Sequence, residues 1–265
     1  MDTMLRISVV VWLAGCAGDT GPTDTTPTDG DADTDSDTDS DTDSDTDSDS
    51  DADTDTDADA DAVLLPDVAG VTFVDGVDNP YFPLPVGATW VYDVASTGEH
   101  IEVEVTADTR VINGVTAVVV RDSGYVDGEL EEDTFDWFAQ DSDGNVWYLG
   151  EDTCEYEAGV CVDTFGSWEW GVNGALPGIV MWADPTVNGQ RYYQEFLAGE
   201  AEDVGEVTGL GEPVDVPAGA FTDCVTTHDT STVDLTISEV KHYCRGIGLT
   251  LTDVEEGLTS SSLVP

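Results

Sequence analysis

The segment IEVEVTADTRVINGVTAVVV, residues 101–120, holds two strand patterns joined by a turn. Apolar and acidic residues alternate from Ile101 to Val105, which is typical of a strand with one buried face. Asn113-Gly114 then interrupts the apolar positions. Both residues accept positive φ, so this dipeptide predicts a two-residue β-hairpin.

Similar patterns recur through the rest of residues 63–265. Asp127-Gly128 predicts a second tight turn, and a strand at residues 134–140 places Phe135, Trp137 and Ala139 on one face. Further strands are expected at residues 89–94, 146–149, 192–197, 202–208, 221–227, 236–243 and 249–254. No run of ten or more residues has a helical period. We therefore predict an all-β fold, a single antiparallel domain of about 10–11 strands, as a curved sheet, an open barrel or a sandwich.

Two segments of this domain look irregular. Residues 171–190 are rich in Gly and Pro but also apolar, which predicts a loop that packs on the core or covers a ligand pocket. The tail at residues 259–265 is expected to fray.

The charge is strongly acidic along the whole chain. Of 58 acidic residues, 20 precede residue 63, together with the basic Arg6. The remaining 38 acids face five bases, a net charge of −33 for residues 63–265. Such a surface repels nucleic acid and anionic lipid headgroups. It suits divalent cations, basic partners or high salt.

Residues 1–15 have the organisation of a signal peptide, with an apolar run too short to span a bilayer. Leu13-Ala14-Gly15-Cys16 resembles the lipobox of bacterial lipoproteins. The resemblance implies cleavage after Gly15 and acylation of Cys16, and several acyl chains give durable anchoring. Ala17, in place of Asp, implies transfer to the outer membrane or cell surface. A secretory signal cleaved without lipidation is the alternative.

The segment that follows is of low complexity. Asp occupies every odd position from 29 to 61, separated by Ala, Thr, Ser or Gly. High like charge and few apolar side chains predict a disordered spacer. The repeat lacks a preorganised loop, so we expect only diffuse, weak Ca²⁺ binding. The predicted layout is a signal peptide at residues 1–15, the lipidated Cys and linker at 16–62, and the β domain at 63–265.

Several short segments of the domain resemble a β-rich, uncharacterised family of secreted bacterial proteins. They are NPYFPL (79–84), GATWVY (87–92), DWFAQD (136–141), GNVWY (144–148) and GIGL (246–249). The resemblance implies one β domain and supplies no catalytic residues.

Four Cys remain besides Cys16, an even number in a chain expected to be exported, which favours disulfides. Cys154 and Cys161 flank the turn residues Ala158-Gly159. Cys224 lies in one predicted strand, at residues 221–227, and Cys244 directly follows a later one, at residues 236–243. We predict the pairs 154–161 and 224–244.

No enzymatic motif stands out. His100, His228 and His242 lack a metal-binding spacing, and no Gly-x-Ser-x-Gly motif is present. Asp141, Asp143 and Asn145 imitate the start of a calcium loop, but a hairpin turn explains the same residues. Acids are so frequent that no catalytic pair can be nominated.

The predicted function is therefore non-catalytic. We expect a monomeric, lipid-anchored protein, attached to the membrane through Cys16, whose domain binds a protein, glycan or apolar ligand or supports envelope structure. No cofactor is expected beyond weak Ca²⁺, and no nucleic acid. The alternatives are a carrier that holds a lipid or other apolar ligand in a curved sheet, and a hydrolase with dispersed carboxylates.

Overall fold

A computed structural model describes residues 62–94, 97–252 and 256–263. The predicted signal peptide, Cys16 and the predicted linker up to residue 61 lie outside these ranges. Within them, no helix is present that is long and apolar enough to cross a membrane.

The described residues form sixteen strands. In chain order they are β1 (Phe73–Val74), β2 (Thr89–Val94), β3 (Glu99–Ile112), β4 (Val115–Val126), β5 (Glu129–Asp141), β6 (Val146–Glu157), β7 (Val160–Asp163), β8 (Trp168–Glu169), β9 (Leu176–Met181), β10 (Arg191–Tyr193), β11 (Glu195–Phe196), β12 (Asp203–Val216), β13 (Gly219–Ser231), β14 (Ser238–Cys244), β15 (Gly248–Thr252) and β16 (Glu256–Ser261).

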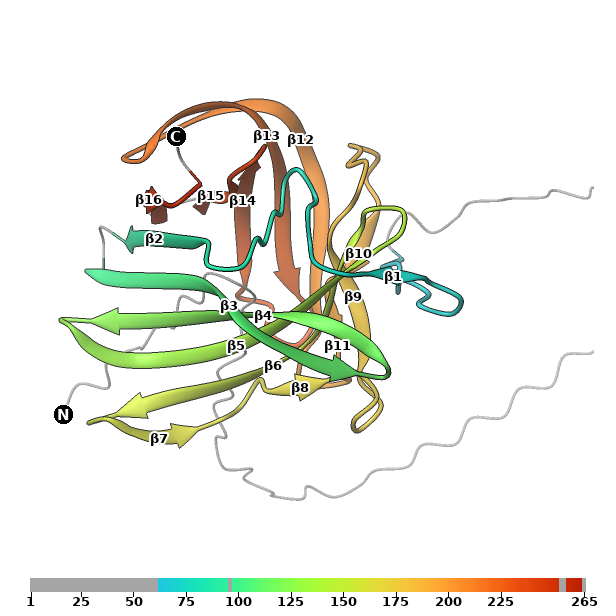
Figure 1. Cartoon of the computed structure of the whole chain (residues 1–265), viewed down its shortest axis with the longest axis horizontal. Helices are drawn as coiled ribbons and strands as arrows, with labels where there is room; N and C mark the ends of the chain where they lie inside the picture. Colours follow the sequence, from blue (N-terminus) through green and yellow to red (C-terminus); the bar gives the residue numbers. More distant parts are fainter. Residues whose placement is uncertain (1–61, 95–96, 253–255, 264–265) are drawn as a thin grey trace, which may run out of the picture. The chain divides into compact units, whose positions relative to one another are not determined.

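These strands build one antiparallel sheet that curls into a nearly closed barrel (Figure 1). Its order is β10-β12-β13-β14-β15-β16-β2-β3-β4-β5-β6-β9-β11. Only Gln194 separates β10, which pairs with β12, from β11, which pairs with β9. The two ends of the sheet therefore meet along one stretch of chain. The predicted all-β antiparallel fold is confirmed, and a barrel is the form it takes.

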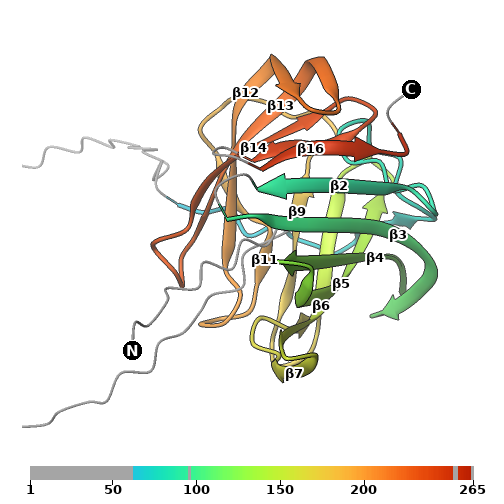
Figure 2. The ribbon, with the colours of Figure 1, turned by 90° about the vertical axis from the view of Figure 1, so that its left-hand side faces the viewer.

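The segment at residues 101–120 lies in the β3–β4 hairpin, as its pattern predicts (Figure 2). Asn113 has φ 49° and Gly114 has φ 84° in the turn, and Asp127 with φ 53° starts the β4–β5 turn. Positive φ at these positions matches the twist of the flanking strands, which is why Asn-Gly and Asp-Gly favour such turns. Local chemistry thus sets the register of three neighbouring strands.

Aromatic side chains pack against one another inside the barrel. The ring centroids of Phe138 lie 5.2 Å from Phe82 and 4.8 Å from Tyr148, and Trp168 lies 5.3 Å from Tyr148. These contacts belong to the main hydrophobic core, which also includes Trp90. One part of the barrel interior is therefore filled by rings.

A second core lies on the outer face of β4, β5, β6 and β9. Trp137 and Ala139 are buried there, and Val71 and Phe73 from the start of the domain pack over them. Phe135, Trp137 and Ala139 share a face, as predicted, but it points away from the barrel interior. From Asp136 to Asp141 both faces of β5 are buried, so the alternation of residue types there does not separate a buried face from an exposed one.

The loop prediction for residues 171–190 is wrong in its central part. Residues Leu176–Met181 form β9, which pairs with β6 and β11. Gly178 lies so close to the neighbouring backbone that a Cβ there would fall 2.4 Å from the Tyr193 carbonyl oxygen. Gly in a strand often marks such an approach, so a close-packed strand looked like a loop.

The prediction of a frayed tail is also wrong for its first residues. β16 ends at Ser261 and pairs with β2, so the chain returns to the barrel wall.

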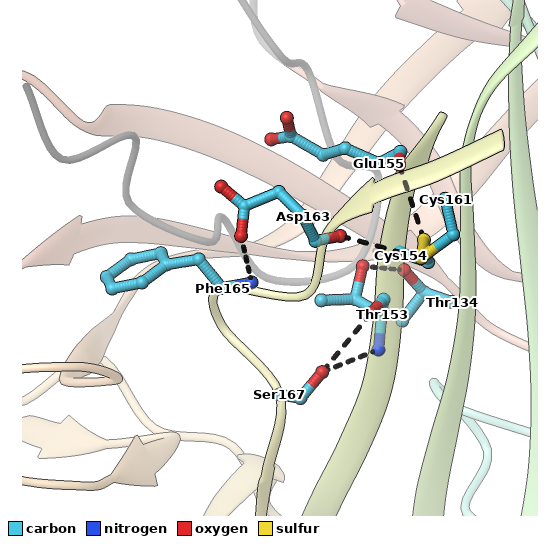
Figure 3. Close-up of a disulfide and its surroundings, with 8 residues drawn as sticks. All are labelled: Thr134, Thr153, Cys154, Glu155, Cys161, Asp163, Phe165 and Ser167. Atoms are coloured by element: carbon cyan, nitrogen blue, oxygen red, sulfur yellow. Dashed lines mark hydrogen bonds between the residues drawn. A yellow bond between two sulfur atoms is a disulfide. The ribbon is translucent and has the colours of Figure 1, made fainter. Parts of the chain in front are cut away.

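Two disulfides cross-link neighbouring strands, in the pairs predicted. Cys224 and Cys244 lie opposite each other on β13 and β14 and are fully buried. Cys154 joins Cys161 between β6 and β7 at the surface (Figure 3). Beside this second bridge, the Ser167 hydroxyl accepts a hydrogen bond from the Thr153 amide at 3.0 Å, which holds the chain after β7 against β6.

Candidate functional site

One end of the barrel interior is lined by carboxyl groups. It is the end where β3, β5, β12, β14 and β16 begin and where their neighbours finish. We call these side chains, together with one ammonium group, the acidic belt. Its members are Glu99, Asp122, Glu132, Asp136, Glu151, Asp203, Asp229, Glu239 and Glu256, with Lys241.

Strand alternation explains why these groups point inward. On β4, Val118, Val120 and Asp122 alternate with outward residues, and all three are buried. Asp122 pairs with Thr134 on β5, and Val120 pairs with Asp136. The inner face of each strand therefore changes from apolar to acidic as it nears this end of the barrel.

Lys241 supplies the belt's ammonium group. Its Nζ lies 3.3 Å from Asp229 Oδ2 and 3.2 Å from Glu239 Oε2, and the residue is 2% exposed. Burial alone would lower the pKa of Lys241, but the charges of Glu239 and Asp229 hold it well above its ordinary value. The ammonium is therefore charged inside the barrel.

Across the interior, Tyr148 joins two acids. Its hydroxyl lies 2.6 Å from both Asp136 Oδ1 and Glu151 Oε2. Burial raises the pKa of Tyr148 well above its usual range, so the hydroxyl keeps its single hydrogen. The Tyr148 hydroxyl donates to both carboxyl groups through this one hydrogen, and a proton on either acid would relieve the sharing. Consistently, burial raises the pKa of Asp136 to about 7 and that of Glu151 well above its ordinary value.

The remaining acids on this side also hold protons strongly. Burial, with the nearby charges of Asp136, Glu132 and Glu256, raises the pKa of Asp122 well above its ordinary value. Burial raises the pKa of Glu132 and Glu99 to about 7, and that of Glu256 to about 8. The side of the belt formed by β3–β6 is thus rich in protonatable groups.

Unpartnered oxygens gather at the same place. Among the described residues, every buried side-chain polar atom without a hydrogen-bond partner lies in the belt or beside it. These atoms are Asp122 Oδ2, Asp136 Oδ2, Gln194 Oε1, Asp203 Oδ1, Thr227 Oγ1, Asp229 Oδ1, Thr252 Oγ1 and both carboxyl oxygens of Glu256. Buried polar groups normally form hydrogen bonds. A group of buried oxygens without partners could therefore accept hydrogen bonds from a bound ligand.

A separate hollow of about 280 Å³ opens on the outer face of β2, β3 and β4. Glu102, Glu104 and Tyr125 line it, together with Arg121, whose guanidinium forms two hydrogen bonds to Asp133 at 2.7 and 2.9 Å. The cation is therefore neutralised within the protein, and this outer groove presents carboxylates.

The predicted calcium candidates form a closed turn. Asp141 Oδ1 accepts hydrogen bonds from the amides of Asp143 and Asn145 at 2.9 Å. Asp141 Oδ2 accepts from Asn145 Nδ2 and from Trp147 Nε1, both at 2.8 Å. Protein donors thus occupy the oxygens that a cation would need, which favours the turn interpretation. In the described part of the chain, no group of three or more His, Cys, Asp or Glu side chains is arranged to hold a metal ion.

The histidines lie apart from the belt. His100 contacts Asp93 Oδ1 at 2.8 Å on the outer face, and the hydrogen bond raises its pKa. His228 contacts Ser238 at 3.0 Å, and His242 contacts Thr226 at 3.1 Å. His228 and His242 lie on neighbouring strands, and each contacts a hydroxyl.

Sequence reasoning did not find the belt. Its acids are spread over eight strands and follow no spacing motif. The available signal was local: Asp136 lies between the large apolar Phe135 and Trp137, and Lys241 lies within a predicted strand. A charged residue within a strand faces either solvent or a polar barrel interior, and the sequence alone does not distinguish the two.

No protein-family model matches the chain, and no curated protein matches it. The resemblance to a β-rich secreted family therefore stays a prediction. One solved structure overlaps with the fold, that of a protein from Parabacteroides distasonis ATCC 8503 described as a "putative lipoprotein". The TM-score is 0.34 and the identity 12%, over 69% of this chain and 99% of that chain.

Proposed function

We propose that this is an exported, lipid-anchored envelope protein whose barrel domain binds a cationic ligand without catalysis. The observation that carries the proposal is the acidic belt, in which buried oxygens lack partners. Buried carboxyl groups are costly unless a proton, a cation or hydrogen bonds compensate them. A cationic ligand would supply both charge and donors.

The charge balance of the domain supports this ligand class. Four of its five bases, namely Arg110, Arg121, Lys241 and Arg245, already form ion pairs with carboxylates. The excess of acids therefore stays uncompensated by the protein. Such a field raises the local concentration of cations and speeds their association.

The lipobox supplies the proposed anchor. Acylation of Cys16 would hold the domain at a membrane, and the predicted Asp-rich linker would separate the two. Both disulfides suit an oxidising compartment outside the cytoplasm.

The anchor is tested by fractionation of cells that produce the protein. We expect Cys16→Ser to move the chain from the membrane fraction to the soluble fraction. An exposed serine, Ser260→Ala, is the matched control and should stay with the membrane. A Cys16→Ser chain that stays in the membrane fraction would contradict the anchor.

The two alternative functions have less support. Packed rings fill the apolar part of the interior, so a lipid carrier would have to displace Phe82, Phe138 or Tyr148. A hydrolase would need two carboxyl groups that act on a substrate, but Asp136 and Glu151 both form hydrogen bonds with the Tyr148 hydroxyl. The arrangement thus favours binding of a small cation over either alternative.

Binding is tested by calorimetric titration of the purified full chain in detergent at low salt. We expect saturable binding by at least one of three probes: Ca²⁺, Mg²⁺ or spermidine. Asp136→Asn should weaken it about tenfold or more, whereas Glu102→Gln with Glu104→Gln in the outer groove should not. If only the outer-groove variants lose binding, the site is misplaced; if no probe saturates, the proposed function is wrong.

A further inference from the structure

The belt contains an ammonium group on one side only. Lys241, on β14, forms ion pairs with Asp229 and Glu239. Its charge also acts to lower the pKa of Asp203 and Glu256. Asp122, Asp136 and Glu151 on β4–β6 have no described Lys or Arg as a partner. The basic residue within β4–β6, Arg121, points outward and pairs with Asp133.

Glu256 lies between the two sides. It pairs with Thr252 on β15, which in turn pairs with Lys241. Its charge also reaches Asp122 and Glu99. Both carboxyl oxygens of Glu256 and the Thr252 hydroxyl lack partners, although Thr252 is only 6% exposed. A donor placed beside Glu256 would therefore meet acceptors from both sides.

We propose that the ligand is an aliphatic amine, whose ammonium group binds between Glu256 and the pair Asp122 and Asp136. The inference rests on the proposed cation-binding function and specifies its ligand. It places a second, external ammonium in the belt beside the built-in ammonium of Lys241.

The arrangement favours an amine over a metal ion. Ca²⁺ needs six to eight oxygens converging at 2.3–2.6 Å, and no described group of three or more acidic or His side chains is arranged for a metal. An ammonium has three N–H donors and tolerates acceptors that are farther apart, as Lys241 shows at 3.2 and 3.3 Å. The unpartnered atoms at the site are oxygens, which N–H donors would satisfy.

In this proposal the amine enters from the end of the barrel that carries the belt. Glu99 and Glu132 are half-buried at the rim, whereas Asp122 and Asp136 are buried beyond them. A linear amine can enter end-on, with its charged group leading and a second ammonium left near the rim acids. Acids at the rim and acids deeper in the barrel thus favour a linear diamine or polyamine over a bulky cation.

Binding exchanges protons for the ligand. In the empty site, burial and mutual repulsion raise the pKa of Asp122 and of the acids around it, so these carboxyl groups retain protons. The neighbouring acids are Asp136, Glu132, Glu256 and Glu99. The ammonium displaces a proton from a carboxyl group to solvent, and no covalent bond changes. Affinity should therefore rise with pH between 6 and 8.5, by up to tenfold per pH unit for each proton released.

Calorimetric titration of the full chain in detergent tests the ligand class. The probes are 1,4-diaminobutane, Ca²⁺, Mg²⁺ and tetramethylammonium, which carries a charge without N–H donors. We expect saturable binding of the diamine, at least tenfold tighter than tetramethylammonium, with proton release into the buffer. Binding of Ca²⁺ or Mg²⁺ without the diamine would overturn this inference but keep the proposed function, whereas no saturable binding overturns both.

Variants locate the site. Asp122→Asn replaces a buried carboxyl group by an amide of the same size, so the barrel should remain folded. Because the amide cannot give up a proton and pair with the ammonium, we expect at least tenfold weaker diamine binding. Asp152→Asn on the exposed face of β6 is the matched control and should bind normally. As a second measurement, propylamine should restore the melting temperature of Lys241→Ala. Equal diamine binding by both Asn variants, or no rescue by propylamine, would contradict the assignment.

Discussion

At the scale of single residues, the molecule depends on charges placed where water does not reach. Lys241 is the clearest case, because an ammonium at 2% exposure is stable only with its acidic partners. Removing one member of a buried ion pair is far more costly than replacing both, since the charge left behind has no compensation.

Lys241→Met is therefore expected to lower the free energy of unfolding by about 3–5 kcal/mol. Urea denaturation at pH 7.5 measures the change. Adding Asp229→Asn should recover at least half of the loss, because a neutral amide then replaces the carboxylate that has lost its partner. A loss below about 1 kcal/mol would show that the pair behaves as a surface salt bridge.

Residue-scale reasoning from sequence succeeded where chemistry is local. Asn113-Gly114 and Asp127-Gly128 form their turns because positive φ is a property of those residues. It failed for Asp122 and Asp136, because an acid in an alternating strand looks the same whether its face meets water or a polar barrel interior. Only closure of the sheet decides between the two, and closure depends on strands far apart in the chain.

At the scale of elements, the two disulfides differ in setting. The Cys224–Cys244 bridge joins central strands and is buried, whereas Cys161 lies exposed on β7 at the margin of the sheet. Exchange with an external thiol requires access to a sulfur. Sequence separation sets the entropic contribution, about 2.5 kcal/mol for the short loop and about 3.3 for the longer one.

We therefore expect dithiothreitol under native conditions to open the 154–161 bridge first. Alkylation and mass spectrometry at timed intervals would follow each cysteine. Replacing both Cys224 and Cys244 by Ala should cost about 3 kcal/mol or more, because buried sulfur packing is lost as well. If both bridges open at the same rate in the folded protein, the burial argument fails.

Element prediction was weakest where a strand carries loop residues. β9 contains Pro177 and Gly178, and only its contacts with β6 and β11 reveal why both are tolerated. Gly178 allows close backbone approach, and Pro177 lies near the start of the strand. These reasons are tertiary, so composition alone favoured a loop.

At the scale of the whole molecule, the acids of the belt couple stability to pH. Folding raises the pKa of Asp136 and Asp203 to about 7, and that of Glu256 to about 8. In the unfolded chain these carboxyl groups return to ordinary values near 4. The folded state therefore binds more protons than the unfolded state between about pH 4 and pH 8.

The sign follows from this difference in bound protons. The stabilisation from protons on these carboxyl groups is fully present below their pKa in the unfolded chain. It is lost as the pH rises through their pKa values in the folded state, so the barrel should be more stable at pH 5.5 than at pH 8.5. Because neighbouring groups titrate together, we expect a net loss of roughly 4 kcal/mol, or a fall in Tm of about 8–16 °C. Calorimetric scans across that range measure it. Asp136→Asn with Glu256→Gln should flatten the dependence, whereas Asp152→Asn with Glu129→Gln, both exposed, should leave it. A Tm that rises with pH would mean that the buried carboxyl groups are ionised and compensated by other means.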